Sequence, residues 1–183
     1  MFSGSAKLRF DREQALRHLC KIPMSPEDRT LYEKPGHLIR RLQQIAVALF
    51  VAETKSFDLT PVQFATLLAI KLHPGIDQTA LANVIAFDRS TLADVVARLV
   101  SKRLIQRSKG EPDGRTKVLR LTPAGAKLLQ EVSPAVEHAQ QKILSPLRPS
   151  ERASFMKMLA KLVNLNNEHS RAPRRSKDVR TRR

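Results

Sequence analysis

Nine basic side chains lie between Asp88 and Thr122, against only four acidic ones: Arg89, Arg98, Lys102, Arg103, Arg107, Lys109, Arg115, Lys117 and Arg120. The whole chain of 183 residues carries 33 basic and 17 acidic side chains, a net charge of +16. Each Lys or Arg that neutralises a phosphate releases condensed counterions, so this excess favours a polyanionic partner over a merely soluble basic surface. Aromatic residues make up only 4% of the chain, which argues against stacking on unpaired bases and favours duplex DNA.

The basic segment begins with a predicted helix over residues 89–102, for which Asp88 is a suitable N-cap. Its apolar residues Leu92, Val95, Val96 and Leu99 share one face. Small or polar residues occupy the opposite face and its border: Ser90, Thr91, Asp94, Ala97, Arg98 and Ser101. Hydroxyls, a carboxylate and a guanidinium on such a face can read base edges in a major groove, although an ordinary surface helix has the same pattern.

Two shorter helices are predicted before it. Thr60-Pro61-Val62-Gln63 contains an N-cap, a proline at the first helical position and a capping-box glutamine, and His73-Pro74-Gly75 ends that helix. Asp77 can cap a helix over residues 78–85, which Ala86-Phe87 separates from the basic helix. Two helices with a tight break between them predict a helix-turn-helix.

A strand, a turn and a second strand follow, over residues 104–107, 108–115 and 116–122. A β-hairpin directly after a reading helix would form a wing. Amphipathic helices flank this part: one over residues 36–55, one from Pro123 to Ile143 with a kink at Pro134, and one after Pro149. The predicted fold class is mainly α with a small β-wing (α+β), built on one core.

The motifs in this order resemble the MarR family of bacterial transcriptional regulators. Residues 113–122 fit the family's wing pattern D-x-R-x-x-x-x-x-L-T, and residues 91–105 are similar to its recognition helix leading into the wing. Residues 121–125 look like the usual start of its fifth helix. The resemblance covers residues 36–168, with 61–122 as the DNA-binding lobe.

The resemblance implies a homodimeric winged helix-turn-helix protein that binds a double-stranded DNA operator, with N- and C-terminal dimerisation helices. It also implies that Arg115 enters the minor groove from the wing tip and that Asp113 holds that tip. Narrow minor grooves have an enhanced negative potential, which suits a guanidinium. The expected DNA-binding residues are Arg89, Ser90, Thr91, Asp94, Arg98, Lys109, Asp113, Arg115 and Lys117.

The chain departs from the family pattern in three places. Many members have glycine where this chain has Arg103, so the basic helix must end without a residue suited to the left-handed conformation. We expect residues 1–35 to be a partly helical N-terminal extension, in which residues 7–20 could form a helix. Residues 169–183 form a basic tail; seven basic groups after Ser170 and almost no apolar ones predict that it is disordered.

Ligand control is the family's usual mode. The resemblance implies a small organic, often aromatic, acid or its CoA thioester, bound between the dimerisation helices and the DNA-binding lobe and releasing DNA. The candidate lining residues are His37, Arg40, Arg41, Gln44, Phe64 and Leu68. Arg40 and Arg41 could meet a carboxylate or phosphate, although solvent-exposed helix charge explains them as well.

Other chemistries have weaker support. Cys20 is the only cysteine, so an intramolecular disulfide is impossible, while a Cys-based redox sensor stays an alternative. The five histidines show no metal-ligand spacing, and no catalytic motif is visible, so we expect no enzyme, cofactor or metal. Without an apolar leader or spanning segment, we expect a cytoplasmic, nucleoid-associated protein. The competing DNA-binding hypothesis is a non-specific architectural protein.

Overall fold

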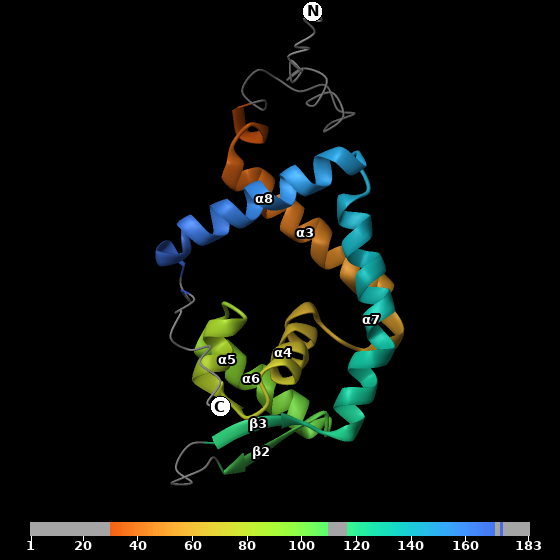
Figure 1. The fold of residues 1–183 in the computed structure, drawn as a ribbon, viewed down its shortest axis with the longest axis vertical. Coiled ribbons are helices and arrows are strands. Elements are labelled where there is room, and N and C mark those ends of the chain that lie inside the picture. Colours follow the sequence, from red (N-terminus) through yellow and green to blue (C-terminus); the bar gives the residue numbers. More distant parts are fainter. Residues whose placement is uncertain (1–29, 110–116, 171–172, 174–183) are drawn as a thin grey trace, which may run out of the picture. The chain divides into compact units, whose positions relative to one another are not determined.

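The computed structural model describes residues 30–109, 117–170 and 173. The chain divides into two compact units, Met1–Gln44 and Ile45–Arg183, and each is described by itself. Helix α3 (Pro35–Glu53) crosses the boundary between them, close to the predicted range of 36–55 (Figure 1).

The first unit contributes an aromatic and cationic cluster at the start of α3. The rings of Tyr32 and His37 meet edge to face, with centroids 5.0 Å apart and planes at 81°. The Arg41 guanidinium lies 5.8 Å from the centre of the Tyr32 ring, within the range of a cation–π contact.

The second unit begins with the last residues of α3 and the short helix η1 (Lys55–Phe57), followed by α4 (Pro61–Leu72). The predicted capping box is confirmed, because the Thr60 side chain accepts from the Gln63 amide and the Gln63 side chain accepts from the Thr60 amide. Helices α5 (Gln78–Val84) and α6 (Arg89–Ser101) follow, and Asp77 and Asp88 cap them as predicted. The helix-turn-helix prediction is therefore confirmed.

A three-stranded antiparallel sheet in the order β1-β3-β2 completes the lobe. Strands β2 (Ile105–Lys109) and β3 (Lys117–Leu121) form the predicted hairpin, but the prediction that the turn starts at Ser108 was wrong, because Ser108 and Lys109 pair with Val118 and Lys117. The third strand, β1 (Ile76–Asp77), was not predicted and pairs with β3.

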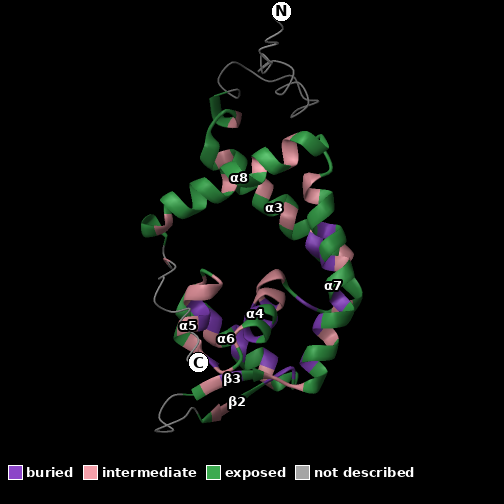
Figure 2. Cartoon of the chain, viewed as in Figure 1, coloured by how far each residue is buried: buried purple, intermediate pink, exposed green. Residues whose placement is uncertain are grey.

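One hydrophobic core holds α4, α5, α6, the sheet and the first half of α7 (Pro123–Leu144) together. Its fully buried side chains include Leu67, Leu81, Leu92, Leu119 and Leu129. Figure 2 shows the buried residues gathered in α4 to α6 and along one side of α7. The predicted apolar stripe of α6 lies inside this core, since Leu92, Val95, Val96 and Leu99 are all buried.

Helix α7 spans 22 residues with Pro134 in its interior, and α8 (Pro149–Leu165) follows it, ahead of the short helix η2 (Asn167–His169). Glu53 joins the end of α3 to α7 by accepting from His138 Nδ1 at 2.7 Å and from Lys142 Nζ at 2.5 Å. These two bonds hold the pKa of Glu53 below its ordinary value. No helix in the described part of the chain is long and apolar enough to cross a membrane.

Candidate nucleic-acid interface

The N-terminus of α6 is organised by one carboxylate oxygen. Asp88 Oδ1 accepts from the backbone amides of Ser90 at 2.9 Å and Thr91 at 3.2 Å, and from the Ser90 hydroxyl at 2.5 Å. The Ser90 hydroxyl, followed by the two amides, lowers the pKa of Asp88. A negatively charged carboxylate at this position also interacts favourably with the positive end of the helix dipole, so α6 starts at a defined residue.

The outward face of α6 carries the residues expected to contact DNA. Ser90, Thr91, Asp94 and Arg98 are exposed on it or at its border, and Arg89 is exposed at the first position of the helix. Because the opposite stripe is buried, this face points away from the core, and its side chains are available to a partner. The structure thus exposes five of the nine predicted DNA-binding residues on one helix.

Both helices of the helix-turn-helix end in the same hydrogen-bond pattern. After α6, the Arg103 amide bonds Val100 O and the Leu104 amide bonds Leu99 O; after α5, the Ala86 amide bonds Asn83 O and the Phe87 amide bonds Ala82 O. This is the Schellman motif, which requires a left-handed residue, usually glycine. Arg103 and Ala86 adopt it, at φ of 57° and 52°. Arg103 therefore ends the helix in the left-handed conformation despite lacking glycine's freedom.

The strands of the wing add further cations. Lys109 and Lys117 are directly opposite each other at the end of the described hairpin, and Arg107 and Arg120 are also exposed. Like charges in directly opposed positions destabilise a strand pair, so this pair favours an anion nearby. Asp113 and Arg115 lie outside the described residues, between these two strands.

Lys102 has a role that sequence reasoning missed. Its Nζ donates to the backbone oxygen of Asp58 at 3.0 Å and to Asp58 Oδ2 at 2.6 Å, which lowers the pKa of Asp58. The ion pair links the end of α6 to the loop before α4. No sequence signal could have found it, because the two residues are 44 positions apart.

A close-packed joint connects the end of α6 to the start of α7. Thr122 Oγ1 donates to Arg103 O at 2.7 Å and accepts from the Gly125 amide at 3.0 Å. A Cβ built on Gly125 would lie 2.0 Å from the Leu104 carbonyl oxygen, so only glycine fits there. Residues 103–104, which follow α6, and the first turn of α7 are therefore packed backbone against backbone.

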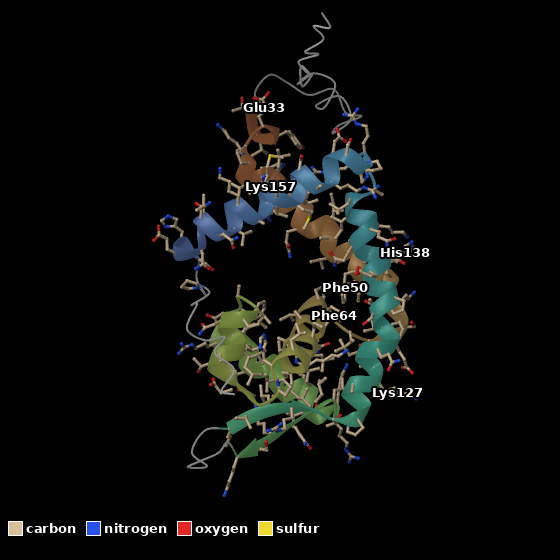
Figure 3. All side chains as sticks on the ribbon, in the orientation of Figure 1. Glu33, Phe50, Phe64, Lys127, His138 and Lys157 are labelled. Atoms are coloured by element: carbon tan, nitrogen blue, oxygen red, sulfur yellow. The ribbon has the colours of Figure 1, made fainter. Side chains whose placement is uncertain are left out.

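The six predicted ligand-binding residues lie on two helices. On α3, Arg40, Arg41 and Gln44 are exposed, while His37 is half-buried and its Nε2 atom has no hydrogen-bond partner among the described residues. On α4, Phe64 is half-buried with its ring centre 5.9 Å from that of Phe50, and Leu68 is exposed (Figure 3). In the described ranges, no three His, Cys, Asp or Glu side chains are grouped to hold a metal ion.

Comparison with known proteins identifies the family. The family model described as MarR family matches residues 57–116, which run from the last residue of η1 to the residue before β3. The HTH-type transcriptional repressor NicR of Pseudomonas putida is 32% identical over 143 residues, which cover 76% of this chain and 90% of that protein. The chain belongs to the MarR family.

Solved structures of MarR-family regulators have the same fold. Bordetella bronchiseptica BpsR, solved to explain how 6-hydroxynicotinic acid regulates its DNA binding, is 31% identical with a TM-score of 0.65. The match covers 69% of this chain and 96% of that one. The transcriptional repressor CouR, bound to a 23-mer DNA duplex, is 25% identical with a TM-score of 0.70, covering 79% and 99%. The predicted winged helix-turn-helix fold is confirmed, and MarR-family proteins are regulators, not enzymes.

Proposed function

We propose that this protein is a sequence-specific repressor of transcription that binds a double-stranded operator and is released by a small organic acid. The observation that carries the proposal is the outward face of α6, where exposed hydroxyl, carboxylate and guanidinium groups stand opposite a buried stripe. In a helix-turn-helix protein the second helix lies in the major groove. We place the DNA-binding lobe at residues 61–122 and the site of action on the bacterial nucleoid.

The residues divide by the part of the duplex they meet. Ser90, Thr91, Asp94 and Arg98 contact base edges, because they occupy the exposed face of α6. The cations Arg89, Lys109 and Lys117 contact phosphates. These contacts fix the register of the protein on the duplex. Arg115 enters the minor groove, with Asp113 holding the wing tip, as the family resemblance implies.

The active form is a homodimer. Helix α8 has no buried side chain in the single chain, and its Met156, Met158, Leu162, Val163 and Leu165 are 49–69% exposed. On α3, Ile45, Val47 and Val51 are exposed as well. Such apolar surface requires a partner, and two-fold homodimers are the commonest solution.

The effector is an aromatic acid or its CoA thioester, and its proposed contacts in the first unit are His37, Arg40, Arg41 and Gln44. In the second unit the sequence predicts Phe64 and Leu68 as contacts. The regulation of BpsR by 6-hydroxynicotinic acid supports this chemical class. A buried polar atom without a partner costs about 1–3 kcal/mol, so a ligand that hydrogen-bonds His37 Nε2 would recover that cost. Arg40 supplies an exposed guanidinium that can pair with a carboxylate.

Competition between a selected operator and random DNA at fixed salt tests the DNA-binding proposal. We expect the operator to bind at least about a thousandfold more tightly. Arg115→Ala should weaken operator binding by about 1–3 kcal/mol with an unchanged melting temperature, because a groove contact is lost. Lys127→Ala, an exposed position on α7, is the matched control. A ratio near one would instead establish a non-specific architectural protein.

Thermal-shift measurements with aromatic acids and their CoA thioesters test the effector proposal. A compound that binds only the folded state raises the melting temperature. The active compound should also lower operator affinity, and Arg40→Gln should weaken its binding. A compound that raises the melting temperature without releasing the operator would contradict the proposed release mechanism.

A further inference from the structure

The hydroxyl of Ser90 has a fixed hydrogen-bond polarity. It lies 2.5 Å from Asp88 Oδ1, and the same oxygen accepts the amides of Ser90 and Thr91. Ser90 is exposed in the first turn of α6, where the N-terminal residues of a recognition helix reach base edges. What this hydroxyl can read therefore depends on its bond to Asp88.

The direction of that bond follows from the charge of Asp88. Its pKa is lowered, chiefly by the Ser90 hydroxyl, so the carboxyl is ionised at neutral pH and can only accept. Serine has a single hydroxyl hydrogen, and this hydrogen must lie between Ser90 Oγ and Asp88 Oδ1. Only the lone pairs of Ser90 Oγ are left for the DNA.

We propose that Asp88 makes Ser90 an acceptor-only reader, which selects an adenine or a cytosine at one operator position by accepting from its exocyclic amine. In the major groove, adenine N6 and cytosine N4 are donors, whereas guanine O6 and N7 and thymine O4 are acceptors. A serine whose hydroxyl is free to rotate bonds either kind, so the discrimination comes from Asp88. The inference deepens the proposed operator binding and rests on it.

Comparison with the cap of the preceding helix, α5, shows that helix capping does not require the bond from the Ser90 hydroxyl to Asp88. Asp77 Oδ1 accepts the amides of Thr79 at 2.8 Å and Ala80 at 2.9 Å, and these two bonds suffice to start α5. Asp88 makes the same two backbone bonds and adds the Ser90 hydroxyl. The hydroxyl bond is therefore separable from the capping function.

Selection of duplexes from a random library, followed by sequencing, tests the proposal with the full-length protein. Wild type should enrich adenine or cytosine at one position, and Ser90→Ala should reduce that preference by about two- to tenfold, the worth of one neutral hydrogen bond. Asp88→Gly should admit guanine and thymine at the same position while keeping α6, since glycine is nearly as good an N-cap. Asp77→Gly, which removes a matched cap and charge, should leave the preference unchanged.

Base analogues give a second readout, because they remove the amine of the base instead of the hydroxyl of the protein. Purine in place of adenine, or 2-pyrimidinone in place of cytosine, removes the exocyclic amine at the selected position. Wild type should lose about the same affinity as Ser90→Ala does, and Ser90→Ala should be insensitive to the analogue. Non-additive losses of this kind identify the two groups as partners.

The inference and the proposed function fail in different ways. A library from which wild type enriches no sequence would overturn operator binding and this inference with it. An enriched operator whose profile is the same for wild type and Ser90→Ala would overturn the inference alone. Enrichment of guanine or thymine at the Ser90-dependent position would also overturn it, as would identical profiles for Asp88→Gly and Asp77→Gly.

Discussion

At the scale of single residues, Arg103 has an unfavourable backbone conformation. This residue ends α6 at a φ of 57°, and Ala86 ends α5 at 52°. A left-handed conformation costs an L-amino acid about 1–2 kcal/mol, so each position lowers stability. In both cases the hydrogen bonds of the Schellman motif and the packing of the following residue, Leu104 or Phe87, hold the backbone in place.

Arg103→Gly should therefore stabilise the protein by about 1 kcal/mol, because the relief of strain exceeds the entropy that glycine loses on folding. The urea midpoint at constant m-value measures this gain. Ala86→Gly is the control, since it makes the same backbone change without removing a charge. If Ala86→Gly stabilises the protein but Arg103→Gly does not, then the arginine side chain stabilises the fold enough to offset the cost of its left-handed backbone.

At the scale of elements, the joint between the end of α6 and the start of α7 leaves almost no space for a larger side chain. Thr122 bonds Arg103 O and caps α7, while Gly125 lets the first turn of α7 lie against the Leu104 carbonyl. The first turn of α7 is therefore tied to residues 103–104, which follow α6.

Gly125→Ala should destabilise the protein by about 1–3 kcal/mol or more, because its Cβ would lie 2.0 Å from a backbone oxygen that cannot rotate away. Denaturant unfolding measures the loss. Gly36→Ala is the matched control, since nothing lies within 4 Å of a Cβ built there. Equal stability of the two variants would show that the joint yields without cost.

At the scale of the whole molecule, the single chain is incomplete. Its DNA-binding lobe has a closed core, whereas α8 exposes Leu162 and Val163 by more than half. Exposed apolar patches of this kind mark interfaces. The proposed homodimer would supply the burial that the single chain lacks.

Sedimentation should accordingly give twice the chain mass of 20.6 kDa for the wild type. Leu162→Glu should shift the protein toward the monomer and weaken operator binding, since a buried carboxylate at the interface would be unpaired. Lys161→Glu makes a charge change at the neighbouring exposed position and should leave the dimer intact. A monomeric wild type would contradict the homodimer.

The sequence by itself determined the features that depend on neighbouring residues. The caps at Thr60, Asp77 and Asp88 were predicted correctly because each joins groups at most three residues apart. The buried stripe of α6 was likewise predicted from its helical period, because the core covers whichever face is apolar. The candidate DNA-binding face of α6 was therefore predicted as the side opposite this stripe, without any tertiary contact.

Only the tertiary structure decided the contacts between distant segments. Strand β1 has two residues and exists through its pairing with β3, and Lys102 binds Asp58 across 44 positions. The closeness of Gly125 to Leu104 and the left-handed Arg103 likewise follow from packing. Local patterns cannot specify such features, because their free energy comes from groups that meet only when the chain has folded.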